Sequence, residues 1–139
     1  MTMSPTLATR APVVARRVLA AFLVAHGVAH FVGTTGALDV ARDGAELSLF
    51  GGAATIGGTE GLVVLAMAWA VVGLAYVGLA APVWRGMAFS GPVLLLVTGA
   101  SLALSVVGLW TSAIGVVIDL VLLALVARAP HLVALRATS

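Results

Sequence analysis

The chain has 139 residues, of which 62% are hydrophobic and only 9% are charged. A soluble domain is usually about 45–50% apolar and about 25% charged. A domain of this size leaves too much of its surface exposed to hide so many apolar side chains from water. The composition excludes an ordinary soluble protein and predicts a single integral membrane domain whose first partner is the lipid bilayer.

The charged residues exclude further classes of function. The net charge is +2 and the isoelectric point is near 10.5, yet all seven basic residues are arginines at the ends of predicted helices. This placement is typical of membrane topology rather than of a nucleic-acid-binding surface. The chain has no cysteine, which excludes disulfides, thiolate metal sites and thiol redox chemistry.

The first 38 residues divide into a tail and a span. Residues 1–17 contain two prolines and three arginines, and we expect a flexible cytoplasmic tail there. Residues 18–38 are apolar over a length that exceeds the roughly 7–15 residues of a signal-peptide core. We therefore predict a retained first transmembrane helix over 18–38.

Three further spans follow a long acidic connection. Residues 39–60 carry four acidic side chains and a glycine-rich run, and the second half of this segment is apolar enough to lie on the membrane or to enter it as a re-entrant segment. Spans are predicted over 62–81, 91–109 and 113–129, with a tight turn at 110–112. The expected fold is all-α, a four-helix transmembrane bundle.

The distribution of arginines between loops predicts the orientation. With the N-terminus inside, only Arg42 lies outside the cell, and six arginines lie on the cytoplasmic side. These six are Arg10, Arg16, Arg17, Arg85, Arg128 and Arg136. We expect a multi-pass protein of the bacterial inner membrane with both termini in the cytoplasm.

Small residues recur where transmembrane helices would pack. The first span has one at every fourth position, and the third span has a row of hydroxyl side chains at helical spacing. In lipid, helices associate through such close contacts and through hydrogen bonds. The predicted packing residues are Ala21, Ala25, Ala29, Gly33 and Ala37, and the hydroxyl row is Thr98, Ser101 and Ser105.

Three ionisable residues lie inside the predicted spans: His26, His30 and Asp119. His26 comes nine residues after Arg17, and Asp119 comes nine residues before Arg128, so both lie near the membrane midplane at one level. His30 shares a helix face with His26, and Thr34 continues that face. Ionisable groups in a membrane are costly and usually mark function, so we expect spans one and four to touch there.

Several roles suit this His–Asp cluster. It could be a structural hydrogen bond, or His26, His30 and Asp119 could bind a metal ion through two imidazoles and a carboxylate. Haem would need a ligand beyond His26 and His30, which lie on one helix face, and His131 is predicted outside the membrane. Thr34, His26, His30 and Asp119 could also bind a small ligand or relay protons.

Several stretches of the chain carry a resemblance to known proteins. These are Val24–Gly33, Trp69, Gly108–Trp110, Ala113–Gly115 and Asp119. Together they resemble small bacterial four-span membrane proteins of the DoxX-like kind. His30 and the acidic connection depart from that pattern. The resemblance implies the topology and no particular activity.

Three classes of function remain open from the sequence. The first is an accessory or structural membrane protein, or one that binds a small ligand at the His–Asp cluster. The second is a redox enzyme that depends on a metal ion or haem. The third is a proton-coupled transporter for small molecules, which four spans could form only as a homo-oligomer or within a larger complex.

Overall fold

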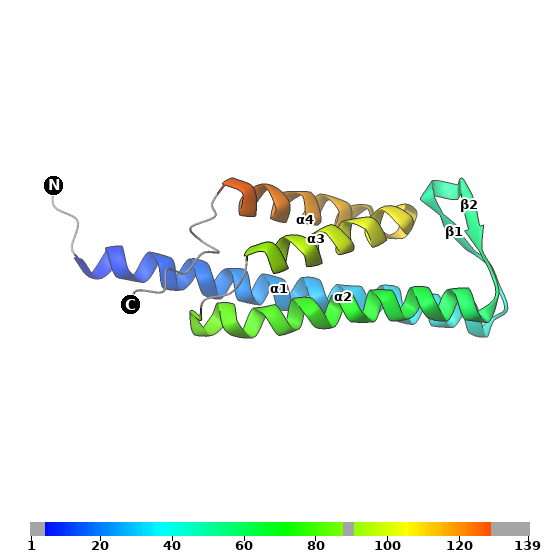
Figure 1. Ribbon diagram of the computed structural model, residues 1–139, viewed down its shortest axis with the longest axis horizontal. Helices are drawn as coiled ribbons and strands as arrows, with labels where there is room; N and C mark the ends of the chain where they lie inside the picture. The colour runs from blue at the N-terminus through cyan, green and yellow to red at the C-terminus, as the bar shows by residue number, and fades with distance from the viewer. Residues whose placement is uncertain (1–4, 88–90, 129–139) are drawn as a thin grey trace.

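The computed structural model describes residues 5–87 and 91–128, and these form four helices and one small β-hairpin (Figure 1). Helix α1 spans Pro5–Arg42 and α2 spans Thr59–Arg85. Helices α3 and α4 span Gly91–Val107 and Leu109–Arg128. Helices α1 and α2 are long and apolar enough to cross a membrane, and α3 is a shorter apolar helix.

The helices pair as two antiparallel hairpins. Helix α1 packs along α2, α3 packs along α4, and the shorter α3–α4 hairpin lies over the longer one (Figure 1). One end of the bundle carries Arg16, Arg17, Arg85 and Arg128, and we call it the arginine end. The opposite end carries the β-hairpin, and we call it the hairpin end.

The connection between α1 and α2 contains regular structure that we did not predict. Strand β1 (Leu47–Leu49) pairs antiparallel with β2 (Ala54–Ile56), in a register that sets Leu47 opposite Ile56. The short helix η1 (Phe50–Gly52) joins the strands and contacts α4. Gly51 and Gly52 have positive φ angles of 69° and 95°, which glycine adopts without a Cβ clash. The hairpin thus folds over the end of the bundle.

Helix boundaries differ from the predicted spans in three places. Helix α1 is already helical at Pro5, where we expected a flexible tail up to Arg17, and proline is well suited to a first turn. Helix α2 continues through Pro82 and ends where Gly86 adopts φ 71°, the left-handed cap that favours glycine. The turn between α3 and α4 lies at Gly108, so residues 110–112 belong to α4 rather than to a loop.

The predicted packing row on α1 is only partly buried. Ala21, Ala25 and Ala29 are exposed, whereas Gly33 is half-buried and Ala37 is buried. A four-residue step advances about 40° around a helix of 3.6 residues per turn, so the row drifts about 160° from Ala21 to Ala37. The first three positions are therefore exposed in the single chain, and Ala37 is the one residue of the row that is buried within it.

The closest contact between α1 and α2 involves two glycines outside that row. A Cβ added to Gly27 would lie 2.7 Å from the carbonyl oxygen of Gly73, and one added to Gly73 would lie 2.8 Å from the carbonyl oxygen of Gly27. The backbones of the two helices therefore meet directly at this level, with room for no side chain. This contact holds α1 and α2 together at mid-length, beside His26 and His30.

The apolar core fills the half of the bundle nearer the arginine end. Side chains from all four helices meet there, including Leu23, Tyr76, Leu94 and Leu122, each at most 1% exposed. The outward faces of the helices are also apolar: Val18, Leu96 and Ile114 are 63%, 74% and 77% exposed. An apolar core inside an apolar surface matches the composition described above.

Candidate functional site

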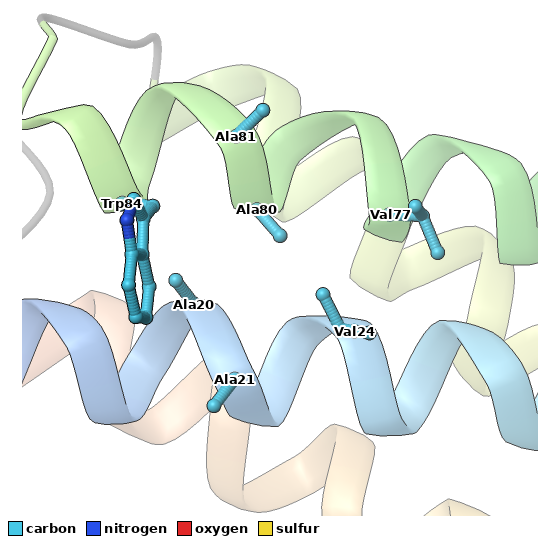
Figure 2. A pocket seen from close by; sticks show the side chains of 7 residues that line it. All are labelled: Ala20, Ala21, Val24, Val77, Ala80, Ala81 and Trp84. Carbon is cyan, nitrogen blue, oxygen red and sulfur yellow. The ribbon is translucent and has the colours of Figure 1, made fainter.

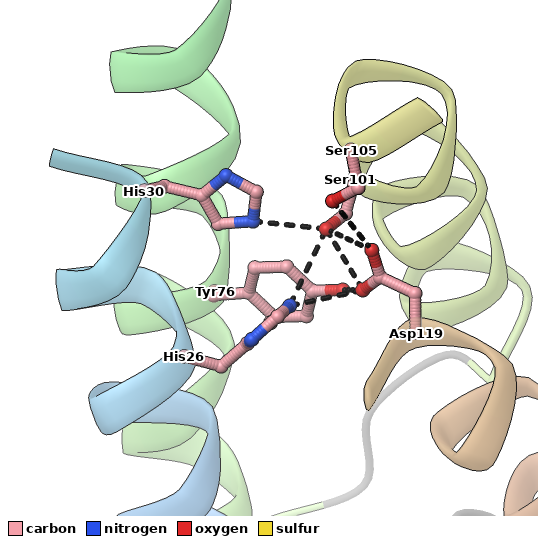
Figure 3. Close-up of polar contacts among 6 residues, drawn as sticks. All are labelled: His26, His30, Tyr76, Ser101, Ser105 and Asp119. Carbon is pink, nitrogen blue, oxygen red and sulfur yellow. Dashed lines mark hydrogen bonds and ion pairs between the residues drawn. The ribbon is translucent and has the colours of Figure 1, made fainter. Parts of the chain in front are cut away.

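Asp119 is the centre of a polar cluster inside the bundle (Figure 3). Its side chain is fully buried on α4 and accepts hydrogen bonds from the three other helices. We define the Asp119 cluster as six residues, His26 and His30 from α1, Tyr76 from α2, Ser101 and Ser105 from α3, and Asp119 itself. Figure 3 shows these side chains converging from opposite sides of the bundle.

Both carboxylate oxygens of Asp119 are occupied. His26 Nε2 lies 2.9 Å from Oδ1, and the Tyr76 hydroxyl donates to the same oxygen at 3.2 Å. The Ser101 hydroxyl lies 2.8 Å from each oxygen, and Ser105 donates to Oδ2 at 3.2 Å. A carboxylate has about four lone-pair positions. Four surrounding donors therefore satisfy it without water.

Ser101 links the two histidines to the carboxylate. Its hydroxyl oxygen lies 2.9 Å from His30 Nε2 and 3.3 Å from His26 Nε2. Because its proton is shared with Asp119, the same oxygen can accept from the His30 ring. The bonds from His30 through Ser101 to Asp119 and back to His26 thus form one continuous network of four polar side chains.

His30 completes only half of its hydrogen bonding. The ring is 2% exposed, and its other nitrogen, Nδ1, has no partner among the described residues. The ring is flanked by Trp69 at 5.0 Å and Tyr76 at 5.7 Å between centroids. A buried nitrogen without a partner costs free energy in either tautomer, so His30 retains an unused position for a hydrogen bond.

A pocket of about 270 Å³ lies against this cluster, and we call it the seam pocket. Its walls come mainly from α1 and α4, and the buried side chains of Trp69 from α2 and Ser105 from α3 lie between them, so the pocket follows the seam between α1 and α4. Its lining is apolar except for the two histidines and Ser105. The lining residues are His26, Ala29, His30, Val32, Trp69, Ser105, Ile114, Gly115 and Ile118. Ala29, Val32 and Ile114 are exposed, which places them at the rim.

The sequence-predicted residues are brought together in part. His26, His30 and Asp119 lie in one network, in which His26 of α1 bonds directly to Asp119 of α4 and His30 reaches Asp119 through Ser101 of α3. Thr34 takes no part in it, because its hydroxyl donates to the His30 carbonyl oxygen at 3.2 Å. His131 lies outside the described residues.

A serine hydroxyl lies between His30 and Asp119, two of the three predicted metal ligands. Among residues 5–87 and 91–128, no group of three or more His, Asp or Glu side chains is placed to hold a metal ion. His30 instead faces the Ser101 hydroxyl, which stands between it and Asp119.

Tyr76 was missed by the sequence reasoning, although a signal for it exists. It is the only tyrosine in the chain, and it precedes Arg85 by nine residues. The same spacing relates His26 to Arg17 and Asp119 to Arg128. Applied to every polar residue in the spans, this depth rule would have placed Tyr76 beside the His–Asp pair.

Comparisons with models of protein families, with curated proteins and with solved structures found no match to this chain.

Proposed function

We propose that this chain is a four-span membrane protein that binds a small, uncharged, lipid-soluble molecule in the seam pocket, against the Asp119 cluster. The N-terminus and the arginine end lie in the cytoplasm. The observation that carries the proposal is a pocket with a polar inner wall and an apolar rim that faces outward between α1 and α4.

Helix lengths and surfaces support four spans. At 1.5 Å per residue, the 17 residues of α3 and the 20 of α4 extend about 26 and 30 Å. Both values are near the roughly 30 Å of a bilayer core. Large apolar side chains are exposed on every helix, at Val18, Val71, Leu96 and Ile114 among others. Lipid is the solvent in which such surfaces are stable.

Charge supports the orientation. Four arginines lie at the arginine end, and the hairpin end carries Asp39, Asp43, Glu46 and Glu60 with a single arginine, Arg42. Cytoplasmic segments of membrane proteins are enriched in arginine and lysine.

The chemistry of the pocket defines its ligand. A molecule that enters from the bilayer between α1 and α4 crosses only apolar side chains, so a charged ligand would pay a large desolvation cost. At the inner wall it meets the two imidazoles and the edge of Trp69. A ligand with one hydroxyl group would form its hydrogen bond with one of the polar side chains that line this wall, His26, His30 or Ser105.

Quenching of Trp69 fluorescence tests this proposal. Trp84→Phe and Trp110→Phe together leave Trp69 as the only tryptophan. We expect 4-bromobenzyl alcohol, whose bromine quenches tryptophan, to quench Trp69 in detergent with a saturable dependence on concentration. Bromobenzene, which lacks the hydroxyl, should bind roughly fivefold more weakly if one hydrogen bond of about 1 kcal/mol is lost.

Two variants separate specific binding from partition into the micelle. Ile114→Phe should block the rim of the pocket and abolish saturable quenching, while Val117→Phe, on an exposed part of α4 outside the pocket lining, should leave it intact. Quenching that rises linearly with either probe, or that is equal in both variants, would refute ligand binding at this site.

A further inference from the structure

A second apolar hollow lies on the opposite side of α1 from the seam pocket, nearer the arginine end. It has a volume of about 430 Å³ and runs between α1 and α2, and we call it the alanine groove. Figure 2 shows Ala20 and Ala80 in the space between the two helices, and the Trp84 ring closing one end. Its lining residues are Ala20, Ala21, Val24, Val77, Ala80, Ala81 and Trp84.

The walls of the groove are made mostly of small side chains. Four of its seven lining residues are alanines, and Ala21, Val24 and Ala81 are exposed along it. No polar side chain lines it apart from the indole of Trp84. A flexible hydrocarbon chain fits such a surface, because it can follow the groove and contacts only apolar atoms.

Positive charge is concentrated at the closed end of the groove. The guanidinium carbon of Arg17 lies 5.4 Å from the centre of the Trp84 ring. The Arg16 guanidinium packs against Gly86, just beyond the last turn of α2. Within the described part of the chain, neither arginine forms an ion pair with a carboxylate, so no acidic side chain there neutralises this positive charge.

An apolar groove with two arginines at its closed end favours an anionic lipid as its occupant. Arginine binds phosphate through paired, charge-assisted hydrogen bonds, and basic pockets between helices at the cytoplasmic side bind anionic lipid headgroups. Trp84 is 52% exposed at the same level, as expected of an aromatic ring at the membrane interface. A symmetric dimer across this face would instead bring the same arginines of two copies together, which like-charge repulsion disfavours.

We propose that the alanine groove binds one acyl chain of an anionic phospholipid, with its phosphate held by Arg17 and Arg16. This inference rests on the membrane topology proposed above but not on ligand binding in the seam pocket. It adds a second site with a different ligand at a different depth. A negative result with 4-bromobenzyl alcohol would therefore leave it unaffected.

Native mass spectrometry of the purified protein in a mild non-ionic detergent tests the inference. Phosphatidylglycerol and phosphatidylcholine with identical acyl chains would be added in parallel. We expect a one-to-one complex with phosphatidylglycerol at concentrations at least tenfold below those needed for phosphatidylcholine. Arg17→Gln should remove this preference, whereas Arg128→Gln, on the last turn of α4, should retain it.

A second pair of variants tests the acyl chain's position. Ala21→Leu should fill the groove and weaken binding of both lipids, while Ala25→Leu, also exposed on α1 but outside the groove, should bind both as the native chain does. Equal binding of the two lipids by the native protein would overturn the inference. A dimer that binds no lipid and is lost in Ala21→Leu would overturn it in favour of a second copy.

Discussion

At the scale of single residues, Asp119 is a buried side chain that bonds to all three other helices. A carboxylate at the centre of a membrane costs about 2.5–3.5 kcal/mol on insertion scales. In the proposed four-span topology, that cost is offset by donors from all three other helices, so the same residue also joins the bundle together. Removing the charge should therefore affect the whole fold rather than one contact.

Asp119→Asn tests this role. An amide replaces one acceptor oxygen by a donor and removes the charge, so Ser105 loses its acceptor if the nitrogen takes the Oδ2 position, and His26 and Tyr76 lose theirs if it takes the Oδ1 position. We expect the free energy of unfolding to fall by about 2–4 kcal/mol, the range for breaking a buried charged network. The melting temperature in detergent, monitored by far-UV circular dichroism, measures this change.

Asp39→Asn is the matched control, because Asp39 is an exposed carboxylate with one 3.5 Å contact to Arg42. An exposed ion pair contributes little to stability. The free energy of unfolding of Asp39→Asn should therefore differ from that of the native protein by less than about 0.5 kcal/mol, with a correspondingly small change in melting temperature. If Asp119→Asn melts at the same temperature as the native protein, the cluster has no structural role and only the binding role remains.

The sequence alone predicted half of the cluster. Equal spacing from the terminal arginines placed His26 and Asp119 at one depth, and the structure pairs them. Ser101 and Ser105 were recognised as a polar row, but a row does not reveal which carboxylate it faces. That depends on the rotation of α3 about its own axis, which is set by packing against α2 and α4 and not by the local sequence.

At the scale of helices, the crossing of α1 and α2 fixes the site. Gly27 and Gly73 let the two backbones touch, and Gly33, further along α1, packs against the ring of Trp69. Such approaches allow contacts between Cα–H groups and carbonyl oxygens, which stabilise helix pairs in lipid. The position of His30 between Gly73 and Trp69 follows from this crossing.

Gly73→Ala tests the crossing against a control in the same helix. Its Cβ would lie 2.8 Å from the Gly27 carbonyl oxygen and 3.2 Å from His30 Cβ, so the helices must separate. We expect a loss of about 1–3 kcal/mol, as for other overpacked sites. Gly78→Ala meets nothing within 4 Å and should be neutral or slightly stabilising, because alanine favours helix.

Thermal melting of both variants decides the question. Equal melting temperatures for Gly73→Ala and Gly78→Ala would mean that α1 and α2 do not touch at this level.

The sequence could not predict this crossing, because its row of small residues on α1 follows a spacing of four, whereas the contact face follows the true helical repeat. The β-hairpin was missed for a different reason, since strands of three residues carry no measurable alternation.

At the scale of the whole molecule, the two ends of the bundle differ in charge and in structure. The proposed orientation sets the arginine end in the cytoplasm and the β-hairpin outside. The chain has no cysteine, so single cysteines can report on each end without further changes.

Arg42→Cys and Arg85→Cys test the orientation. A membrane-impermeant maleimide added to intact cells should label position 42 and leave position 85 unlabelled until the cells are permeabilised. Labelling of position 85 from outside would reverse the topology and would also move the proposed phospholipid site to the outer leaflet. Labelling of both positions after permeabilisation confirms that each cysteine is reactive.

The hydrogen bonds between α3 and α4 have a consequence for biogenesis. In the proposed four-span topology, the α1–α2 hairpin leaves the ribosome first during synthesis, and Asp119 enters the membrane before it reaches His26 or Tyr76. Ser101 and Ser105 belong to the same hairpin as Asp119 and bond to both of its oxygens. The α3–α4 hairpin therefore contains hydrogen-bond donors for its own carboxylate. We expect this to lower the cost of moving the hairpin into lipid before it packs against the α1–α2 hairpin.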